Sequence, residues 1–455
     1  MKGSLNRLLL LSACALCACG QGDDAESPTM TPSPEPPQAA FLTVELRNGE
    51  KPETFDRSCE AFSEVLVVRS NRDWAVEISG EETSWLHVEK SSAATVDLSA
   101  AVNTGRADRR ARILFYTSDR EASVELAVNQ QGSELFGGAP IRDLLLIYVD
   151  DPDNGPGPDK QRFEKLVAAW IDGEAQWLFD GFLFLGNYFH GRSFMATGQH
   201  SPTRRQDWLD MLDRLFAKQE SIPALDEALE ETRRQIPGPF HRRKVVIFLP
   251  DPQAGQTDWG EINGRQMDFN ASDDRILACN WYVDRILERF AAANLRNIQL
   301  AGIYWLTENG GFLPQHLCQV ARHVHDLGLE FYWIPYYEAF GYDRWKEYGF
   351  DRAWYQPNYL FQSSTPRQRL IDAWQTAQSL GMSIEMEFDS NYPLERNTDY
   401  VDVYEQLGLF DTLDLAYYGD DALAYWQDGI ASEQELFRRI AGIIAQRQQT
   451  ATTDK

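Results

Sequence analysis

The sequence DLLLIYVDD, residues 143–151, is the first of eight short apolar or aromatic runs, most of which end in acidic residues. The other runs are WLFDGFLFLG from Trp177, KVVIFLPD from Lys244, IQLAGIYWLTEN from Ile298, LEFYWIPYYEA from Leu329, DRAWYQPNY from Asp351, MSIEMEFDSN from Met382 and TLDLAYYGDD from Thr412. Helix-like amphipathic stretches separate most of them. Strands that alternate with helices indicate parallel βαβ units, and eight units predict a closed (β/α)8 barrel of the TIM type.

The stretches between these runs supply the helices and loops of the predicted barrel, which we place at residues 140–449. The predicted helices cover residues 161–172, 206–235, 273–293, 314–327, 366–380, 400–407 and 432–445. Two long insertions, residues 191–204 and 252–274, follow the second and third strands. Loops on this side of a barrel shape its cleft, because active sites form at the carboxyl ends of the strands. The acidic strand ends therefore predict an enzyme cleft.

Composition narrows the classes of partner. The chain has 455 residues, enough for a barrel and a smaller domain, and its net charge is −26 from 43 basic and 69 acidic residues. This balance disfavours nucleic acid and anionic membrane surfaces, because phosphate binding needs a basic face. A neutral oligo- or polysaccharide is compatible with it. The bland alternative is that most of the charge serves solubility.

The amino terminus has the pattern of a secretory signal. Lys2 and Arg7 precede an apolar run of 11 residues, 8–18, which is too short to span a bilayer as a helix. Residues 16–19, LCAC, resemble a bacterial lipobox, which implies cleavage after Ala18 and lipidation of Cys19. Residues 11–14, LSAC, also fit, but they would leave a very short hydrophobic region.

The segment after Cys19 supports export. Residues 23–26, DDAE, resemble the acidic export tags of surface lipoproteins in the Bacteroidetes. Residues 27–38 contain five prolines, so residues 19–40 are predicted to form a flexible tether. The expected location is the outer membrane, with a lipid anchor and the protein facing the cell surface. The sequence assigns no oligomeric state.

Cysteine and histidine spacing predicts neither a disulfide framework nor a metal site. Only Cys59, Cys279 and Cys318 lie outside the signal region. An odd number excludes complete pairing; a Cys279–Cys318 disulfide is one alternative, and buried free thiols are favoured. No cysteine or histidine spacing is typical of zinc, and His323 and His325 fall on different faces of a helix.

One acidic loop has oxygen ligands of the kind that calcium takes. Residues 150–155, DDPDNG, bring oxygen ligands close together in the sequence. They lack the acid at the twelfth loop position of an EF-hand, so we interpret the segment as a loop. No metal and no cofactor are predicted.

Residues 41–133 have a different pattern, with short alternating stretches separated by turn residues. Seven strands are predicted, and they are LTVELRN, SEVLVVRSN, DWAVEIS, WLHVEK, TVDLSAAVN, ARILFYTS and ASVELAVNQQG. Such a series is typical of an antiparallel, immunoglobulin-like sandwich. The chain is therefore predicted to be multidomain, with a sandwich before the barrel.

The landmarks SNRDW at 70–74, Trp85, VN at 102–103 and VNQQG at 128–132 resemble a BACON domain. That module occurs beside glycan-processing domains in Bacteroidetes proteins. Trp74 and Trp85 are candidates for stacking on sugars, but burial in the sandwich core is favoured for both. A spacer between membrane and barrel is the expected role.

The barrel segment also resembles a known family. DLLLIY at 143–148, WLFDGFLF at 177–184 and WIPYY at 333–337 are similar to family 4855 of domains of unknown function. The resemblance covers nearly all of the segment. It supports the domain boundary and implies no activity.

Two glutamates are the candidate catalytic pair. In the large clan of retaining glycosidases on this fold, the acid/base and the nucleophile lie at the ends of strands four and seven. Here those positions hold Glu308 and Glu387. The resemblance implies Glu308 as acid/base and Glu387 as nucleophile, although Thr307 stands where the clan usually has asparagine.

Alternation refines strand seven. Met382, Ile384, Met386 and Phe388 form an apolar face, so Glu385, Glu387 and Asp389 are expected to point into the barrel. Glu387 lies nearer the rim, and Glu385 competes with it. The alternative role for the pair is an ion-pair or hydrogen-bond network with Arg344 or Tyr418.

Further candidates are expected to orient sugar hydroxyls or stack on sugar rings. They are Asp150, Asp180, Trp305, Tyr337, Glu338, Glu385, Asp389 and Tyr418, with Asp420 also considered. At least half of the aromatic residues on the strands must face the helix layer, since neighbours in a strand point to opposite sides.

The leading hypothesis is a surface lipoprotein with glycoside hydrolase activity, because two acids at the proper positions hydrolyse a glycosidic bond. The alternatives are a glycan-binding barrel without catalysis and a polysaccharide lyase or other non-hydrolytic sugar enzyme. No GxSxG, GxxxxGK[ST] or HExxH motif points elsewhere.

Overall fold

The computed structural model describes residues 38–80, 82–138, 140–149, 151–195, 200–238, 240–310 and 314–453. The predicted signal peptide, Cys19 and most of the tether lie outside these residues, as does Asp150. Within the described part of the chain, no helix is both long and apolar enough to cross a membrane.

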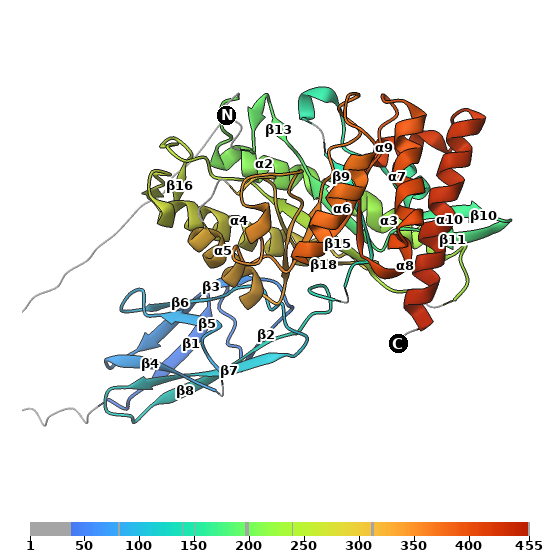
Figure 1. The fold of residues 1–455 in the computed structure, drawn as a ribbon. Helices are drawn as coiled ribbons and strands as arrows, with labels where there is room; N and C mark the ends of the chain where they lie inside the picture. Colours follow the sequence, from blue (N-terminus) through green and yellow to red (C-terminus); the bar gives the residue numbers. More distant parts are fainter. Residues whose placement is uncertain are drawn as a thin grey trace, which may run out of the picture. The chain divides into compact units, whose positions relative to one another are not determined.

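Residues before the barrel form two four-stranded sheets, drawn in blue in Figure 1. One sheet has the order β1-β3-β6-β5 and the other the order β2-β8-β7-β4. The strands are β1 (Leu42–Leu46), β2 (Thr54–Arg57), β3 (Phe62–Ser70), β4 (Trp74–Ser79), β5 (Leu86–Glu89), β6 (Thr95–Ala100), β7 (Arg109–Thr117) and β8 (Ser123–Gln130). Strand β2 was not predicted, and it pairs with β8 in parallel, whereas the other pairings are antiparallel.

The two sheets share a core of alternating apolar side chains, including Leu66, Val96 and Ile113. Trp74 is buried there, and its indole N–H donates to the carbonyl of Ala93 at 2.9 Å. Trp85 is half-buried under the guanidinium of Arg109. Both tryptophans were predicted to be buried in the core, and this is confirmed for Trp74 but only in part for Trp85.

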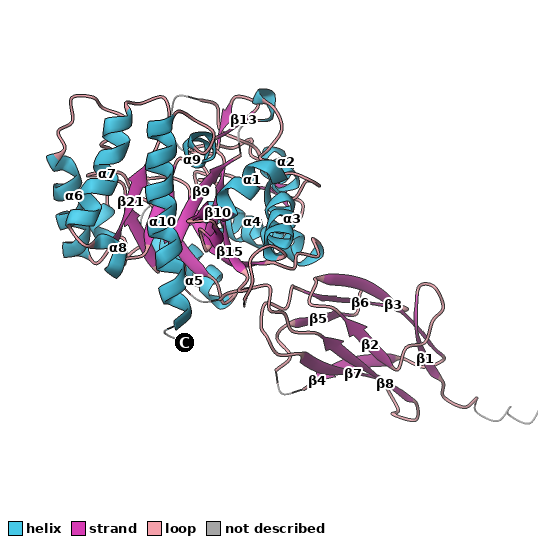
Figure 2. Cartoon of the chain, turned by 90° about the vertical axis from the view of Figure 1, so that its right-hand side faces the viewer, coloured by secondary structure: helices cyan, strands magenta, loops and turns pink. Residues whose placement is uncertain are grey.

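The second part of the chain is a closed barrel of eight strands, the central magenta strands of Figure 2. Every neighbouring pair is parallel. In chain order the strands are β9 (Asp143–Tyr148), β12 (Gly181–Leu185), β15 (Arg243–Leu249), β18 (Ile298–Trp305), β19 (Glu330–Trp333), β20 (Arg352–Tyr355), β21 (Ser383–Glu387) and β22 (Leu415–Tyr418). The prediction of eight parallel strands is confirmed, and β18 and β21 are the fourth and seventh.

Helices follow most of the strands and surround the barrel (Figure 2). Their bounds are α1 (Lys160–Val167), α2 (Arg205–Leu215), α3 (Ser221–Arg233), α4 (Ser272–Ala292), α5 (Pro314–Asp326), α6 (Gln368–Leu380), α7 (Leu394–Gln406), α8 (Leu409–Thr412), α9 (Asp420–Trp426) and α10 (Ala431–Thr453). Short 3-10 turns lie at Pro152–Asn154 and Tyr342–Arg344.

Two helix predictions were wrong. The predicted helix 206–235 is divided into α2 and α3, because Gln219 and Ser221 have positive φ and Pro223 lacks the N–H that a continuous helix needs. The predicted helix 161–172 ends at Val167, and the chain then forms a hairpin of β10 (Ala168–Ile171) and β11 (Glu174–Trp177). Asp172 and Gly173, both with positive φ, make its turn.

Two small hairpins occupy the loops predicted above the second and third strands. They are formed by β13 (Tyr188–Phe189) with β14 (Arg192–Ser193), and by β16 (Glu261–Ile262) with β17 (Arg265–Gln266). The two insertions therefore contain local structure of their own.

A buried ion pair joins the last helix to the first barrel strand. Nε of Arg447 on α10 lies 2.7 Å from Oδ1 of Asp143 on β9. Tyr417 and Gln448 also donate to this carboxylate, at 2.9 and 2.8 Å. Since β22 pairs with β9 at the same place, these bonds secure the closure of the barrel.

The prediction of free thiols is confirmed, but of the three cysteines only Cys279 is buried, while Cys59 and Cys318 are half-buried. Cys59, Cys279 and Cys318 are all free, so the alternative Cys279–Cys318 disulfide is not formed. Burial raises the pKa of the Cys279 thiol, which keeps it protonated and unreactive.

Candidate functional site

Three glutamates come together at the carboxyl ends of the barrel strands. Glu308 lies just beyond the end of β18, and Glu385 and Glu387 lie on β21. The three carboxyl groups influence one another electrostatically, since both Glu308 and Glu387 raise the pKa of Glu385. Burial raises the pKa of Tyr148, at the end of β9, and of Tyr304, on β18, and the charges of Glu308 and Glu385 raise both pKa values further. We call these three acids the central carboxyl cluster.

Glu387 is fully buried and accepts four hydrogen bonds. The backbone N–H of Asn358 donates to Oε1 at 3.0 Å, and those of Tyr359 and Leu360 donate to Oε2 at 3.1 and 3.4 Å. The hydroxyl of Tyr400 on α7 also donates to Oε2. Burial raises the pKa of Glu387, and the four donors oppose that shift by favouring the ionised carboxylate, since a backbone N–H can only donate.

Glu385 has the opposite environment. It is fully buried, and neither carboxylate oxygen accepts a hydrogen bond from a described residue with normal geometry. Burial raises its pKa well above the usual range, and the charges of Glu387 and Glu308 raise it further. The amide of Gln356 lies near enough to lower that pKa slightly. The environment of Glu385 therefore favours the neutral carboxylic acid.

Glu308 is the half-buried member of the cluster and thus the one that solvent reaches. Burial raises its pKa to about 7, with a smaller contribution from the charge of Glu387. A group that titrates near neutral pH can both give and take a proton under physiological conditions. The cluster thus contains one carboxylate held by four donors, one acid whose neutral form is favoured, and one group able to exchange protons.

Thr307, which departs from the glycosidase pattern, does not face this cluster. Its side chain is buried, and Oγ1 donates to Oδ2 of Asp251 at 3.0 Å. Asp251 follows β15 and pairs with Arg275 of α4 at 3.2 Å. Thr307 therefore joins strand four to the neighbouring strand and helix instead of offering its hydroxyl to a ligand.

Asp180 was predicted to bind substrate, but the structure places it at the other end of the barrel. It precedes β12, and its carboxylate accepts the backbone N–H groups of Arg142 and Asp143 at 2.8 to 3.1 Å. The apolar run from Trp177 predicted Asp180 inside strand two, whereas the strand begins at Gly181. Asp180 thus aligns the starts of the first two strands.

Trp305 is also misplaced by the prediction. It is fully buried on β18, next to Tyr304, whose hydroxyl faces the central cluster. Since neighbours in a strand point to opposite sides, Trp305 packs toward the helix layer and has no face open to a sugar. Arg344, the cation considered as a partner of the acids, instead pairs with Glu347.

Four other candidates lie at the rim. Tyr418 is half-buried and contacts the ring of Tyr148 at 5.6 Å between centroids. Burial is the largest cause of the raised pKa of Tyr418, and the charges of Asp389 and Glu385 raise that pKa further. Tyr418 and Asp389 therefore border the cluster. Tyr337 is half-buried under the guanidinium of Arg369, 3.8 Å from its ring, and Glu338 is exposed.

Asp420 begins α9 and pairs with Arg162 of α1. It is buried, and burial raises its pKa to about 7. Its side chain is committed to holding two helices together, which agrees with a structural role.

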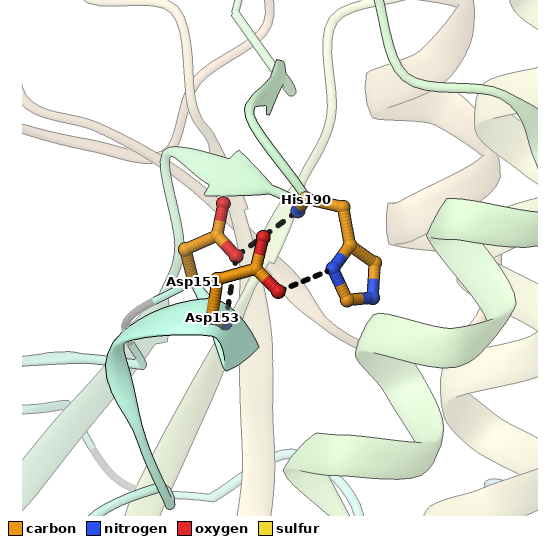
Figure 3. Close-up of side chains that lie close together, drawn as sticks. All are labelled: Asp151, Asp153 and His190. Carbon is orange, nitrogen blue, oxygen red and sulfur yellow. Dashed lines mark hydrogen bonds and ion pairs between the residues drawn. The ribbon is translucent and has the colours of Figure 1, made fainter.

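The acidic loop after β9 gains a histidine that the sequence did not connect to it. Asp151, Asp153 and His190 place their ligand atoms within 4.8 Å of one another (Figure 3). Nδ1 of His190 lies 2.8 Å from Asp153, and the carboxylate of Asp151 accepts the backbone N–H groups of Asp153, His190 and Gly191. These bonds fasten the loop to the β13–β14 hairpin and account for the arrangement without an ion.

Sequence reasoning missed three members of the site. Tyr148 ends strand one beside the predicted acids, so the strand count alone contained a signal for it. Gln356 follows β20 in the same way. Tyr400 had no such signal, because it reaches Glu387 from a helix that was predicted to begin only at residue 400.

The site is a cluster of carboxyl groups at the centre of a closed parallel barrel. The family of the chain is shown by its sequence. Residues 143–443 match the model described as "Domain of unknown function (DUF4855)", and the chain belongs to this family. The resemblance identified in the sequence is thereby confirmed. No curated protein matches the chain.

The chain is similar to several solved structures at low sequence identity. A Bacteroides ovatus GH5 xyloglucanase in complex with an XXXG heptasaccharide is 10% identical, with 88% of this chain and 100% of that chain covered and a TM-score of 0.27. Bacteroides thetaiotaomicron EndoBT-3987 in complex with Man9GlcNAc2Asn is 11% identical, with 84% and 90% covered and a TM-score of 0.28. An NMR structure of another protein from Bacteroides thetaiotaomicron is 15% identical over 20% of this chain and 85% of that chain, with a TM-score of 0.17. Scores this low carry no argument about function.

Proposed function

We propose that this chain is a glycan-processing enzyme and that its barrel is a retaining glycoside hydrolase. One observation carries the proposal: Glu308 and Glu387 end strands four and seven of one closed parallel barrel and are electrostatically coupled, with the pKa of Glu308 near 7. Glycosidic hydrolysis needs two carboxyl groups in different protonation states. The environments of these two supply that difference.

In this mechanism Glu308 is the acid/base. Protonated, it gives its proton to the leaving glycosidic oxygen, and in the second half of the reaction it takes a proton from water. Its partial exposure and its pKa of about 7 both suit a group that must exchange protons with substrate.

Glu387 is the nucleophile in the proposed mechanism. Oε1 accepts a single hydrogen bond, from Asn358, whereas Oε2 accepts three. Oε1 is therefore the oxygen with a lone pair left for attack on the anomeric carbon. Because Glu387 is fully buried, attack requires residues 358–360 to move aside when substrate binds.

Glu385, neutral and unpaired, is the proposed donor of a hydrogen bond to a substrate hydroxyl. Tyr418 and Asp389 at the rim are proposed to orient the sugar, and a neutral oligo- or polysaccharide suits a chain of charge −26. The buried Trp305 and the distant Asp180 have no part in this scheme.

The same proposal includes the setting of the enzyme. We assign the barrel to the (β/α)8 class and the preceding sheets to an immunoglobulin-like, BACON-type spacer. Cys19 is proposed to carry the lipid that anchors the protein to the outer membrane. Metabolic labelling with a fatty acid tests the anchor: the label should enter the wild type and be absent from Cys19→Ala.

A second candidate function is a glycan-binding barrel without catalysis. The observation that favours it is the complete burial of both glutamates on β21. In this case Glu387 serves only to hold residues 358–360 and α7 in place, and sugars bind at the rim.

A panel of neutral glycans tests the hydrolase against the binding barrel. The wild type should release product, Glu308→Gln should lower the rate about 10²-fold to 10⁴-fold, and the exposed Glu164→Gln should leave it unchanged. Proton NMR of the first product should show the anomer of the substrate. Full activity in Glu308→Gln would remove the proposed acid, and binding without turnover of any glycan would favour the second candidate.

A further inference from the structure

A cavity lies at the amino-terminal end of the barrel, opposite the central carboxyl cluster. It has a volume of about 590 Å³, within the range of small-molecule sites. Its walls come from the residues before β9 and β12, the start of β15, the β11 strand and the end of α10. Four of its lining side chains are arginine or lysine and three are aspartate, so the balance is basic in a chain whose net charge is −26.

Arg243, the first residue of β15, is one of the basic residues that line this cavity. Arg243 is only 7% exposed, and it forms part of the cavity wall. Nε is buried without a hydrogen-bond partner, and no described residue accepts a hydrogen bond from the rest of the guanidinium or forms an ion pair with it. The ring of Trp177 lies against it, with its centroid 4.8 Å from the guanidinium carbon.

The acids nearby do not neutralise Arg243. Asp180 acts on it only at longer range, and its carboxylate is occupied by the backbone N–H groups of Arg142 and Asp143. Asp414 pairs with Arg352. Burial without a partner lowers the pKa of Arg243 to about 10, yet the group stays charged at neutral pH. A buried charge is costly unless a counter-charge and hydrogen bonds accompany it.

We propose that this cavity is a binding site for a small organic anion, whose carboxylate or phosphate pairs with the guanidinium of Arg243. The planar fork of arginine matches the two oxygens of such a group. Trp177 and Phe240, whose rings lie 5.3 Å apart, provide an apolar wall for the body of the molecule. The proposal is independent of the hydrolase, because the two sites lie at opposite ends of the strands.

Isothermal titration calorimetry tests the site with three probes of one size class: glucuronate, glucose 6-phosphate and neutral glucose. Glucuronate or glucose 6-phosphate should bind the full chain, more weakly as salt rises, and glucose should not. Arg243→Met should weaken the binding about tenfold or more, the loss expected for a charge-assisted hydrogen bond. Arg234→Met, which removes an exposed arginine outside the cavity, should leave binding unchanged.

Two further measurements keep the result clear. Glu308→Gln should bind the anions as the wild type does, so failure of the hydrolase proposal leaves this site untouched. If Arg243→Met does not fold, hydrogen exchange on the wild type should show that the anion protects residues 240–244. Absence of anion binding at millimolar concentration, or equal binding in a folded Arg243→Met, would overturn the proposal.

Discussion

The hydroxyl of Tyr400 donates a hydrogen bond to Oε2 of Glu387, and this contact connects α7 to the strand that carries two of the central acids. Together with three backbone N–H groups it makes Glu387 the more readily ionised glutamate of β21. The negative charge so fixed raises the pKa of Glu385 and Glu308. One hydrogen-bond arrangement thus organises the protonation of the whole cluster.

Tyr400→Phe and Tyr404→Phe form a matched pair for measuring that arrangement. Both hydroxyls are buried, but Tyr400 donates to a carboxylate and Tyr404 donates to the carbonyl of Glu385 at 2.9 Å. We expect Tyr400→Phe to lower the free energy of unfolding by about 1.5–3 kcal/mol and Tyr404→Phe by about 0.5–1.5 kcal/mol. Urea denaturation measures both. Equal losses would show that Glu387 is not charged in the folded protein.

Glu385→Gln should stabilise the protein increasingly as pH rises. The pKa of Glu385 in the folded protein is raised above its ordinary value of 4.5. As pH rises above 4.5, the unfolded wild type ionises more readily than the folded wild type, so the free energy of unfolding falls. Glutamine keeps the shape and cannot ionise. Melting temperatures of the two proteins across the pH range should diverge in favour of the variant at high pH. A constant difference at every pH would contradict an unpaired, neutral Glu385.

The rate of hydrolysis should fall as pH rises through about 7. Glu308 must be protonated to act as the acid, and burial sets its pKa to about 7. The charge of Glu387 is the second cause of the raised pKa of Glu308, so removing that charge should lower the pKa. In any residual activity of Glu387→Gln, the basic limb of kcat/KM should move to lower pH. If the basic limb does not move, it does not report the titration of Glu308.

Arg447→Met should be strongly destabilising. It would leave the carboxylate of Asp143, which is fully buried, without its cation. The expected loss is about 3–5 kcal/mol, measured by chemical denaturation. Arg234→Met, at an exposed helix end, should change stability by no more than about 0.5 kcal/mol. If Asp143→Asn is combined with Arg447→Met, part of the loss should be recovered, since position 143 then carries no buried carboxylate that lacks its cation.

The sequence was sufficient for the barrel and for part of the site. Apolar runs separated by helical patterns identified all eight strands, because each strand is buried and its signal is local. Alternation along residues 382–389 predicted that Glu385 points toward the barrel centre, and the charge of Glu308 does raise the pKa of Glu385. Strand counting likewise brought Glu308 and β21 to the same end.

Contacts between distant segments could not be predicted in this way. The N–H groups that cover Glu387 come from residues 358–360, nearly 30 positions earlier, and their direction depends on a loop. The place of Asp180 depended on where β12 begins, and a shift of a few residues moved it from the cleft to the opposite end of the barrel. The pairing of Thr307 with Asp251 spans 56 positions and had no sequence signature.

The bond between Arg447 and Asp143 also bears on how the protein is made. The two residues are 304 positions apart, and their contact lies beside the pairing of the first barrel strand, β9, with the last, β22. During synthesis, the first strand therefore has no permanent neighbour on one side until almost the whole chain has emerged. We expect nascent chains that end before α10 to remain unclosed, sensitive to proteases and dependent on chaperones. A protein exported in an unfolded form would gain from this late closure, because it delays folding until translocation is nearly complete.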